Sequence, residues 1–342
     1  MKNGGIPGRK AMSKNYEMQH HPLISVIVPV YNAGRYVAEC LDSIAKQSYA
    51  NLEVVMINDG SSDDSGAVCE RFAAGDHRFR LINTVNRGVS AARNLGIAEA
   101  RGRYVMFVDA DDMIHPSMLE RLMEVAAESG SDITICSMYY GAEPRWPEKR
   151  GEVEIYLPEK IVELGMYQKR MVNMPCAMLI EKAIFDTDAS LRFRQGIRYE
   201  DLDFFYKLLL AARKVAYFRE NLYFYRAHSE SFINTFSPQR ADMLDVTDEM
   251  LLYMQRRGDE RLVKAARDRR FSAHYNMWLL LIAGGVEMPE IEARCLGVVK
   301  GERLAELANP HVRMKNKLGA IASYGGRRLV GFLMKMMKKD KV

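Results

Sequence analysis

The chain has 342 residues, of which 48% are hydrophobic and 27% are charged. These values are typical of a globular protein with one large core and a smaller additional region. No apolar run reaches the roughly 18 residues of a membrane-spanning helix, so no membrane-spanning segment is expected. Residues 311–342 contain nine Lys or Arg and one Asp, a local charge of +8, which leaves −3 of the total of +5 for the rest. This acidic body argues against a nucleic-acid partner.

The N-terminal residues and the cysteines indicate the cellular compartment. Residues 1–21 are polar and lack the apolar centre of a signal peptide, so we expect a disordered leader and a protein that is not secreted. Five cysteines are present, and no pair has the spacing of metal ligands. We expect reduced thiols in the cytoplasm, buried as small apolar side chains. These cysteines are Cys40, Cys69, Cys136, Cys176 and Cys295.

From residue 23 to residue 138 the sequence alternates between apolar runs and amphipathic segments. The predicted strands are residues 23–30, 52–58, 79–83, 104–109 and 132–138. Two helices are expected directly after Asn32 and Ser90, which would act as their N-caps. A third helix is expected over residues 65–74. Continuous apolar strands that alternate with helices predict an α/β fold with a doubly wound, mostly parallel sheet flanked by helices.

Polar clusters follow three of these strands, where an open α/β sheet binds its ligands. They are Tyr31-Asn32, the turn-rich segment 58–63 and the acidic run 109–112. In the second cluster, Asp59 is either part of a turn or an acceptor for the N–H of a nucleobase, because a carboxylate only accepts hydrogen bonds. The carboxyl edge of the sheet is therefore the predicted site.

The acidic run contains Asp109, Asp111 and Asp112 directly after an uncharged strand. Three carboxylates at one strand end repel each other unless a cation or hydrogen-bond donors offset their charge. Hard divalent cations prefer oxygen ligands and leave positions open for phosphate oxygens, so the run predicts Mg2+ or Mn2+ bound with a diphosphate. A solvated acidic turn is the alternative. A calcium loop is disfavoured because Ile114 occupies the position of its glycine.

Arg93 follows a glycine turn, in the first turn of an expected helix. A cation there is unfavourable for the helix dipole unless it faces an anion. Either a phosphate or the carboxylates after Val108 could be that anion, and an incidental surface position is the remaining alternative.

Two later segments carry further candidates. Glu200 and Asp201 begin an amphipathic helix, where acidic residues either favour the helix dipole or supply a general base for an acceptor hydroxyl. Arg226 and His228 lie in an aromatic and hydroxyl-rich segment that could cover a diphosphate. Both are also common as structural residues.

Beyond residue 237 the sequence is mainly helical. Two helices are expected over residues 241–284 and short helices over 287–307, so residues 238–310 form a predicted helical C-terminal region. Residues 311–342 mix basic and apolar side chains, which suits an anionic membrane surface, although a solvated basic tail has a similar composition. Four glycines in this tail disfavour one long helix.

Signatures of several other α/β enzymes are missing from the sequence. There is no G-x-G-x-x-G, no G-x-x-x-x-G-K-[ST], no H-E-x-x-H and no G-x-S-x-G. A nucleotidyltransferase would need a lysine in the loop after the first strand, and V-Y-N-A-G has none.

Taken together, the segments V-I-V-P-V-Y-N, V-V-M-I-N-D-G-S-S-D-D-S, N-R-G-V-S-A-A-R-N-L-G-I and Y-V-M-F-V-D-A-D-D resemble the bacterial family 2 glycosyltransferases, which have the GT-A fold. Order and spacing match over residues 24–116, and R-Y-E-D-L-D-F and Y-F-Y-R-A-H-S extend the likeness to about residue 231. Residues 173–180 depart from the N-K-L-Y type stretch of the family.

The resemblance implies an inverting transfer from a nucleoside diphosphate sugar, usually a UDP-sugar, with Mn2+ or Mg2+ as cofactor. The acceptor would be a saccharide or lipid-linked saccharide of surface polysaccharide or glycolipid assembly. A catalytic domain is then expected over residues 22–237, at the cytoplasmic face of the membrane if the tail binds it. A non-catalytic nucleotide-sugar-binding protein of the same fold is the alternative.

The same resemblance implies a role for nine of the candidates. Pro29, Tyr31 and Asp59 would hold the nucleoside, and Arg93 would belong to the donor site. Asp109 and Asp111 would form a D-x-D pair that contacts the ribose and the metal-bound diphosphate, and Asp112 would share this task. Asp201 would be the catalytic base with Glu200 beside it.

Overall fold

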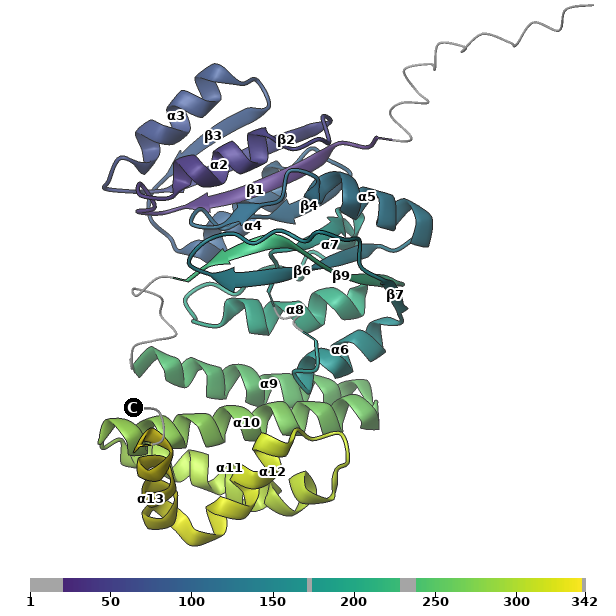
Figure 1. The fold of residues 1–342 in the computed structure, drawn as a ribbon. Coiled ribbons are helices and arrows are strands. Elements are labelled where there is room, and N and C mark those ends of the chain that lie inside the picture. The colour runs from purple at the N-terminus through teal and green to yellow at the C-terminus, as the bar shows by residue number, and fades with distance from the viewer. Residues whose placement is uncertain (1–20, 171–173, 228–237, 340–342) are drawn as a thin grey trace, which may run out of the picture.

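The computed structural model of the chain describes residues 21–170, 174–227 and 238–339. A sheet flanked by helices forms one part of the molecule, and a layer of helices from the C-terminal third packs beneath it (Figure 1). The leader, apart from His21, lies outside the described residues. The expected fold class, an α/β fold with a helical C-terminal region, is confirmed.

Nine strands form one mixed sheet within the described residues, in the order β3-β2-β1-β4-β8-β6-β9-β5, with β7 beside β9. Their bounds are β1 (Ile24–Val30), β2 (Leu52–Asp59), β3 (Phe79–Thr84), β4 (Tyr104–Phe107), β5 (Met113–Ile114), β6 (Ile133–Gly141), β7 (Val153–Tyr156), β8 (Met178–Glu181) and β9 (Val215–Arg226). The long pairings β1–β2, β2–β3 and β6–β9 are parallel, as predicted. The short strand β8 lies antiparallel between β4 and β6, which the sequence analysis did not predict.

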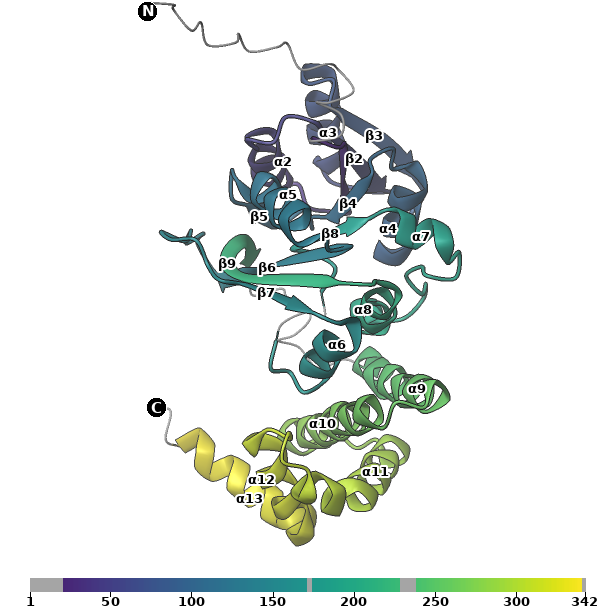
Figure 2. The same ribbon diagram turned by 90° about the vertical axis from the view of Figure 1, so that its right-hand side faces the viewer.

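Helices cover both faces of the sheet. They are α2 (Val37–Ala45), α3 (Ser65–Gly75), α4 (Val89–Glu99), α5 (Met118–Ser129), α6 (Pro158–Met166), α7 (Ala183–Thr187) and α8 (Glu200–Ala211). Figure 2 shows α2 and α5 on one side of β4, and α4 and α7 on the other. In the centre of the sheet, β4 is buried at every residue and β1 at every residue but Pro29, which explains their continuous apolar sequence.

Two helices begin at residues other than those expected. Asn32 does not cap α2, because its backbone is left-handed (φ 47°) and its side-chain oxygen accepts from the Ser62 N–H at 2.8 Å. The helix therefore begins later, at Val37. Ser90 lies inside α4, and the N-cap is Gly88 at φ 89°, a conformation that glycine adopts without strain.

The helical region contains α9 (Asp242–Arg257), α10 (Glu260–Gly284), α11 (Pro289–Ala308), α12 (Met314–Ala322) and α13 (Gly326–Lys339), with short 3-10 turns at Pro238–Ala241 and Ser323–Gly325. The expectation of several short helices over 287–307 was wrong. One helix, α11, forms because Cys295 and Val299 on one face are buried against α10, and such packing outweighs the cost of internal glycines.

Residues 311–339 pack partly into this region. Ala320 and Val330 are buried in a core shared with Phe271 and Trp278 of α10. The glycine-rich break predicted in this segment separates α12 from α13 at the turn before Gly326. In the described part of the chain, no helix combines the length and apolarity needed to cross a bilayer.

Candidate active site

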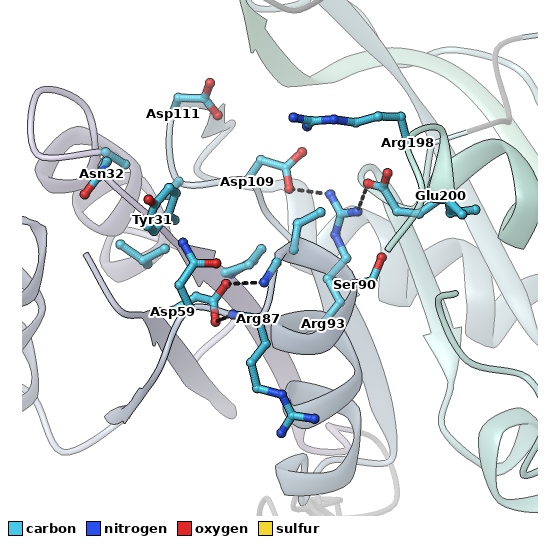
Figure 3. Close-up of a pocket in the computed structure, with 18 of the residues that line it drawn as sticks. Tyr31, Asn32, Asp59, Arg87, Ser90, Arg93, Asp109, Asp111, Arg198 and Glu200 are labelled. Atoms are coloured by element: carbon cyan, nitrogen blue, oxygen red, sulfur yellow. Dashed lines mark hydrogen bonds and ion pairs between the residues drawn. The ribbon is translucent and has the colours of Figure 1, made fainter. Parts of the chain in front are cut away.

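A cleft of about 750 Å3 opens at the carboxyl ends of β1, β2 and β4, beside the beginnings of α4, α8 and α9 (Figure 3). Parallel strands end at one edge of a sheet, so polar residues that are far apart in the sequence meet there. The cleft is lined by seven of the predicted residues: Pro29, Tyr31, Asp59, Arg93, Asp109, Asp111 and Glu200.

Asp59 anchors the loop that precedes α4. It is 2% exposed, and its two carboxylate oxygens accept from the backbone N–H groups of Arg87 and Gly88 at 2.9 and 2.8 Å. Gly88 is the residue at φ 89°, so the loop conformation and the carboxylate contacts depend on each other. A nucleobase in the cleft would have to use the remaining lone pairs of the same oxygens.

Arg93 joins two carboxylates across the cleft. Its guanidinium donates to Asp109 Oδ1 and to Glu200 Oε1, both at 2.9 Å, and lies 5.3 Å from the centre of the Phe193 ring. Burial opposes its charge, but Asp109 and other neighbours more than offset this and raise the pKa of Arg93 above its usual value. The sequence left open whether Arg93 faces a phosphate or a carboxylate. In the structure its partners are the carboxylates of Asp109 and Glu200.

The three aspartates of the acidic run face different surroundings. Asp109 and Asp111 line the cleft, whereas Asp112 is 1% exposed and lies behind it. Asp112 accepts from the Tyr223 hydroxyl at 2.6 Å and from the Arg226 backbone N–H at 2.9 Å. Burial and the two neighbouring aspartates raise the pKa of Asp112 to about 8. The structure thus does not bring Asp112 to the expected metal site.

The remaining donors fit a divalent cation that binds together with a diphosphate. Among the described residues, no cluster of three or more His, Cys, Asp or Glu side chains could hold a metal ion. Asp109 and Asp111 still offer carboxylate oxygens to the cleft. Mg2+ is commonly held by one or two carboxylates plus substrate phosphates, so two carboxylates are a sufficient protein contribution.

Arg226 contacts the backbone of the acidic run at Asp111. Its Nε donates to the Asp111 carbonyl at 2.9 Å, and its Nη2 forms an ion pair with Glu39 at 2.7 Å. It also lies 5.0 Å from the ring centre of Tyr36, which lines the cleft. Arg226 is thus placed beside the cleft and is not among its lining residues. His228 lies outside the described residues.

Glu200 and Asp201, the acidic pair at the beginning of α8, have different surroundings. Glu200 lines the cleft and holds Arg93. Asp201 is not among the lining residues, and its Oδ1 accepts from the Leu202 N–H at 2.7 Å. Burial, followed by the charge of Glu200, raises the pKa of Asp201 to about 6.

The cleft also contains residues to which the sequence analysis assigned no role. Arg198 points across the cleft toward Asp109 (Figure 3), and its backbone N–H donates to Asp242 Oδ2 at 2.9 Å. A cation two residues before an acidic pair is a signal that could have identified Arg198. Asp242 and Gln239 carry no such signal, because they reach the cleft only through the packing of α9 and of the 3-10 turn Pro238–Ala241 that precedes it.

Known proteins resemble this chain in sequence. The family model described as Glycosyl transferase family 2 matches residues 25–188. Glycosyltransferase GlyG of Streptococcus pneumoniae is 33% identical over 229 residues, which cover 62% of this chain and 73% of GlyG. The uncharacterized glycosyltransferase EpsJ of Bacillus subtilis is 35% identical over 216 residues, which cover 61% of this chain and 62% of EpsJ.

Solved structures resemble it in fold. S. aureus TarS 1-349 in complex with UDP-GlcNAc has a TM-score of 0.68 at 20% identity, over 93% of this chain and 92% of that one. The mannosyltransferase PcManGT from Pyrobaculum calidifontis, in complex with GDP-Man and Mn2+, has a TM-score of 0.52 at 15% identity, over 93% and 88%.

Proposed function

The chain belongs to glycosyl transferase family 2, and from this membership we propose that it transfers a sugar from a nucleoside diphosphate sugar, in particular a UDP-sugar, to an acceptor hydroxyl. The main support is the cleft in which Asp59, Asp109, Asp111 and Arg93 meet at the carboxyl edge of the sheet. TarS with UDP-GlcNAc and PcManGT with GDP-Man support nucleotide-sugar binding on this fold.

In this proposal, the two sides of the cleft bind different parts of the donor. Pro29, Tyr31 and Asp59 line the side assigned to the nucleoside, and Tyr31 is 53% exposed, so its ring is available for stacking. Asp109 and Asp111 would hold Mn2+ or Mg2+, which supplies positive charge to the leaving diphosphate. Arg93 keeps Asp109 in place between the two halves of the site.

The reaction is a single displacement with inversion. The acceptor oxygen attacks the anomeric carbon, and the bond between that carbon and the diphosphate oxygen breaks. The electron pair stays on the diphosphate, and the acceptor proton passes to the carboxylate of Asp201. A carboxyl group with a pKa of about 6 is ionised at neutral pH and still basic enough to accept a proton from a hydroxyl as it reacts.

A thermal-shift screen of nucleotide sugars with and without Mn2+ tests the proposal. A ligand that binds only the folded state raises the melting temperature, and at a fixed concentration the shift increases with the logarithm of its affinity. A UDP-sugar with Mn2+ should therefore give the largest shift. The variant Asp111→Asn should lose most of the Mn2+-dependent part. If no nucleotide sugar stabilises the protein, the proposal fails. Stabilisation without any UDP release in the presence of saccharide acceptors would favour the non-catalytic binder.

We also propose that the C-terminal residues contact the anionic cytoplasmic face of the membrane, where a lipid-linked acceptor of surface polysaccharide or glycolipid assembly would be found. Five apolar side chains on α12 and α13 are exposed despite the packing of these helices: Met314, Leu318, Ile321, Leu329 and Phe332. The same segment is basic, since residues 311–342 have a charge of +8. Exposed apolar and basic side chains together favour an anionic lipid surface.

Liposome flotation tests this contact. The double variant Leu318→Ser/Phe332→Ser removes exposed apolar side chains and leaves the buried Ala320 and Val330 in place. It should float with anionic liposomes less than the unchanged protein does. Leu304→Ser on α11, where the side chain is 69% exposed, is the matched control. Equal flotation of all three proteins would rule the contact out.

A further inference from the structure

A second cavity, a groove of about 350 Å3, lies outside the donor cleft. Its lining is mainly apolar and comes from one face of α10, with Met243 of α9 opposite. Ala273, Met277, Leu280 and Ala283 provide the α10 face. Of the described residues that line the groove, two are cationic, Arg240 and Lys315, and none is a carboxylate. Its chemistry is thus an apolar surface beside positive charge.

One wall separates the groove from the cleft, and its residues alternate between the two cavities. Where the chain enters α8, Arg198 and Glu200 line the cleft, whereas Tyr199 between them lines the groove. At the beginning of α9, Asp242 lines the cleft and Met243 lines the groove. Neighbouring Cα atoms are only about 3.8 Å apart, so the two cavities lie back to back.

The wall is held together by a specific contact and a specific backbone conformation. The Arg198 backbone N–H donates to Asp242 Oδ2 at 2.9 Å, which joins the turn before α8 to α9. Tyr199 is left-handed (φ 61°) at the residue where the chain passes from the groove to Glu200. A non-glycine residue in this conformation requires support from its surroundings, so the wall has a defined position relative to both cavities.

We propose that the groove binds the hydrocarbon end of a lipid-linked acceptor, whose saccharide reaches over the wall into the cleft. This inference rests on the proposed glycosyl transfer. The apolar α10 face favours a hydrocarbon chain, and Arg240 and Lys315 favour an anionic linkage, a phosphate or diphosphate, over a neutral one. Lys315 belongs to α12, which carries the exposed apolar Met314 and Leu318, so the groove adjoins the helix expected to meet the lipid surface.

Binding of dodecyl phosphate, below its critical micelle concentration, tests the groove without turnover. The variant Ala283→Trp fills the groove from an exposed position of α10 and leaves the buried core residues unchanged. It should weaken binding about tenfold or more, because excluding only about two methylene groups from an apolar site has that effect. Ala308→Trp, at an exposed residue of α11 outside the groove, is the matched control and should bind as the unchanged protein does.

A comparison of an anionic with a neutral amphiphile tests the preference for an anionic linkage. The double variant Arg240→Gln/Lys315→Gln should lose affinity for dodecyl phosphate and keep its affinity for the neutral dodecyl maltoside. Lys300→Gln on α11 controls for the loss of one exposed cation. Equal binding of both amphiphiles to the unchanged protein would overturn the anionic linkage. Full competition by inorganic phosphate alone would mean that the site binds phosphate and not a lipid.

Donor binding, measured on the same proteins, separates this inference from the proposed function. Ala283→Trp should keep the thermal shift given by UDP-sugar and Mn2+, because Ala283 does not line the cleft. If Ala283→Trp binds dodecyl phosphate as tightly as Ala308→Trp does, the groove assignment is wrong while the donor site stands. Dodecyl phosphate binding without any nucleotide-sugar binding would instead overturn the proposed transfer and leave a lipid site.

Discussion

Arg93 of α4 and Glu200 of α8 are 107 positions apart in the sequence and form an ion pair of 2.9 Å at the floor of the cleft. The same guanidinium holds Asp109 at the end of β4. One buried cation therefore connects the proposed donor half of the site to the helix that carries the proposed base.

Arg93→Met should destabilise the protein strongly. The change removes a buried cation and leaves Asp109 and Glu200, which are 24% and 15% exposed, without their partner. Breaking a buried ion pair costs up to about 3–5 kcal/mol of unfolding free energy. Urea unfolding measures the loss. Arg103→Met is the control, because Arg103 is 59% exposed in its pair with Glu181 and its loss should cost about 0–1 kcal/mol. Similar losses in the two variants would contradict the role of Arg93.

Asp201→Asn should leave donor binding nearly unchanged and reduce transfer by about 10²–10⁴-fold, the usual contribution of a general base. Product formation and UDP-sugar affinity are measured on the same preparation. Glu200→Gln is the comparison, because Glu200 lines the cleft and holds Arg93. If Asp201→Asn keeps near-normal turnover and Glu200→Gln loses it, Glu200 is the base and the assignment to Asp201 is wrong.

Transfer should increase with pH through about 6. Burial and the charge of Glu200 raise the pKa of Asp201 to about 6, and only the ionised carboxylate can accept the acceptor proton. The measurement is kcat as a function of pH under saturating donor. In Glu200→Gln the neighbouring negative charge is gone, so the midpoint should move to lower pH. A profile without any decrease below about pH 6 would contradict this role.

The helical region should lose stability as pH rises from about 5 to about 9. Glu306 is 2% exposed, and burial together with Asp268 raises its pKa from 4.5 to about 9. Between these values the folded state binds a proton that the unfolded state has released, so unfolding becomes easier by up to about 1.4 kcal/mol per pH unit. Urea unfolding across this range checks it. In Glu306→Gln the decrease should be much smaller, and an equal decrease would implicate other groups.

Much of the site could be predicted from the sequence, for a local reason. The apolar strand before Asp109 and the turn-forming residues after Asn58 are visible as short patterns, and parallel strands must bring their ends together. The strands, the sheet edge and the cleft residues Tyr31, Asp59 and Asp111 follow from such patterns. The number and spacing of the cysteines predicted free, buried thiols, and all five are free and buried in the structure.

Only the tertiary structure decided which partners these residues have. Asp111 and Asp112 are neighbours with the same side chain, yet one lines the cleft and the other turns to Tyr223, because β9 passes behind the acidic loop. The antiparallel β8 and the wall that contains Tyr199 likewise depend on contacts between distant segments. A sequence pattern records which face of its own element a residue occupies, whereas charge pairing and cavities depend on what packs against that face.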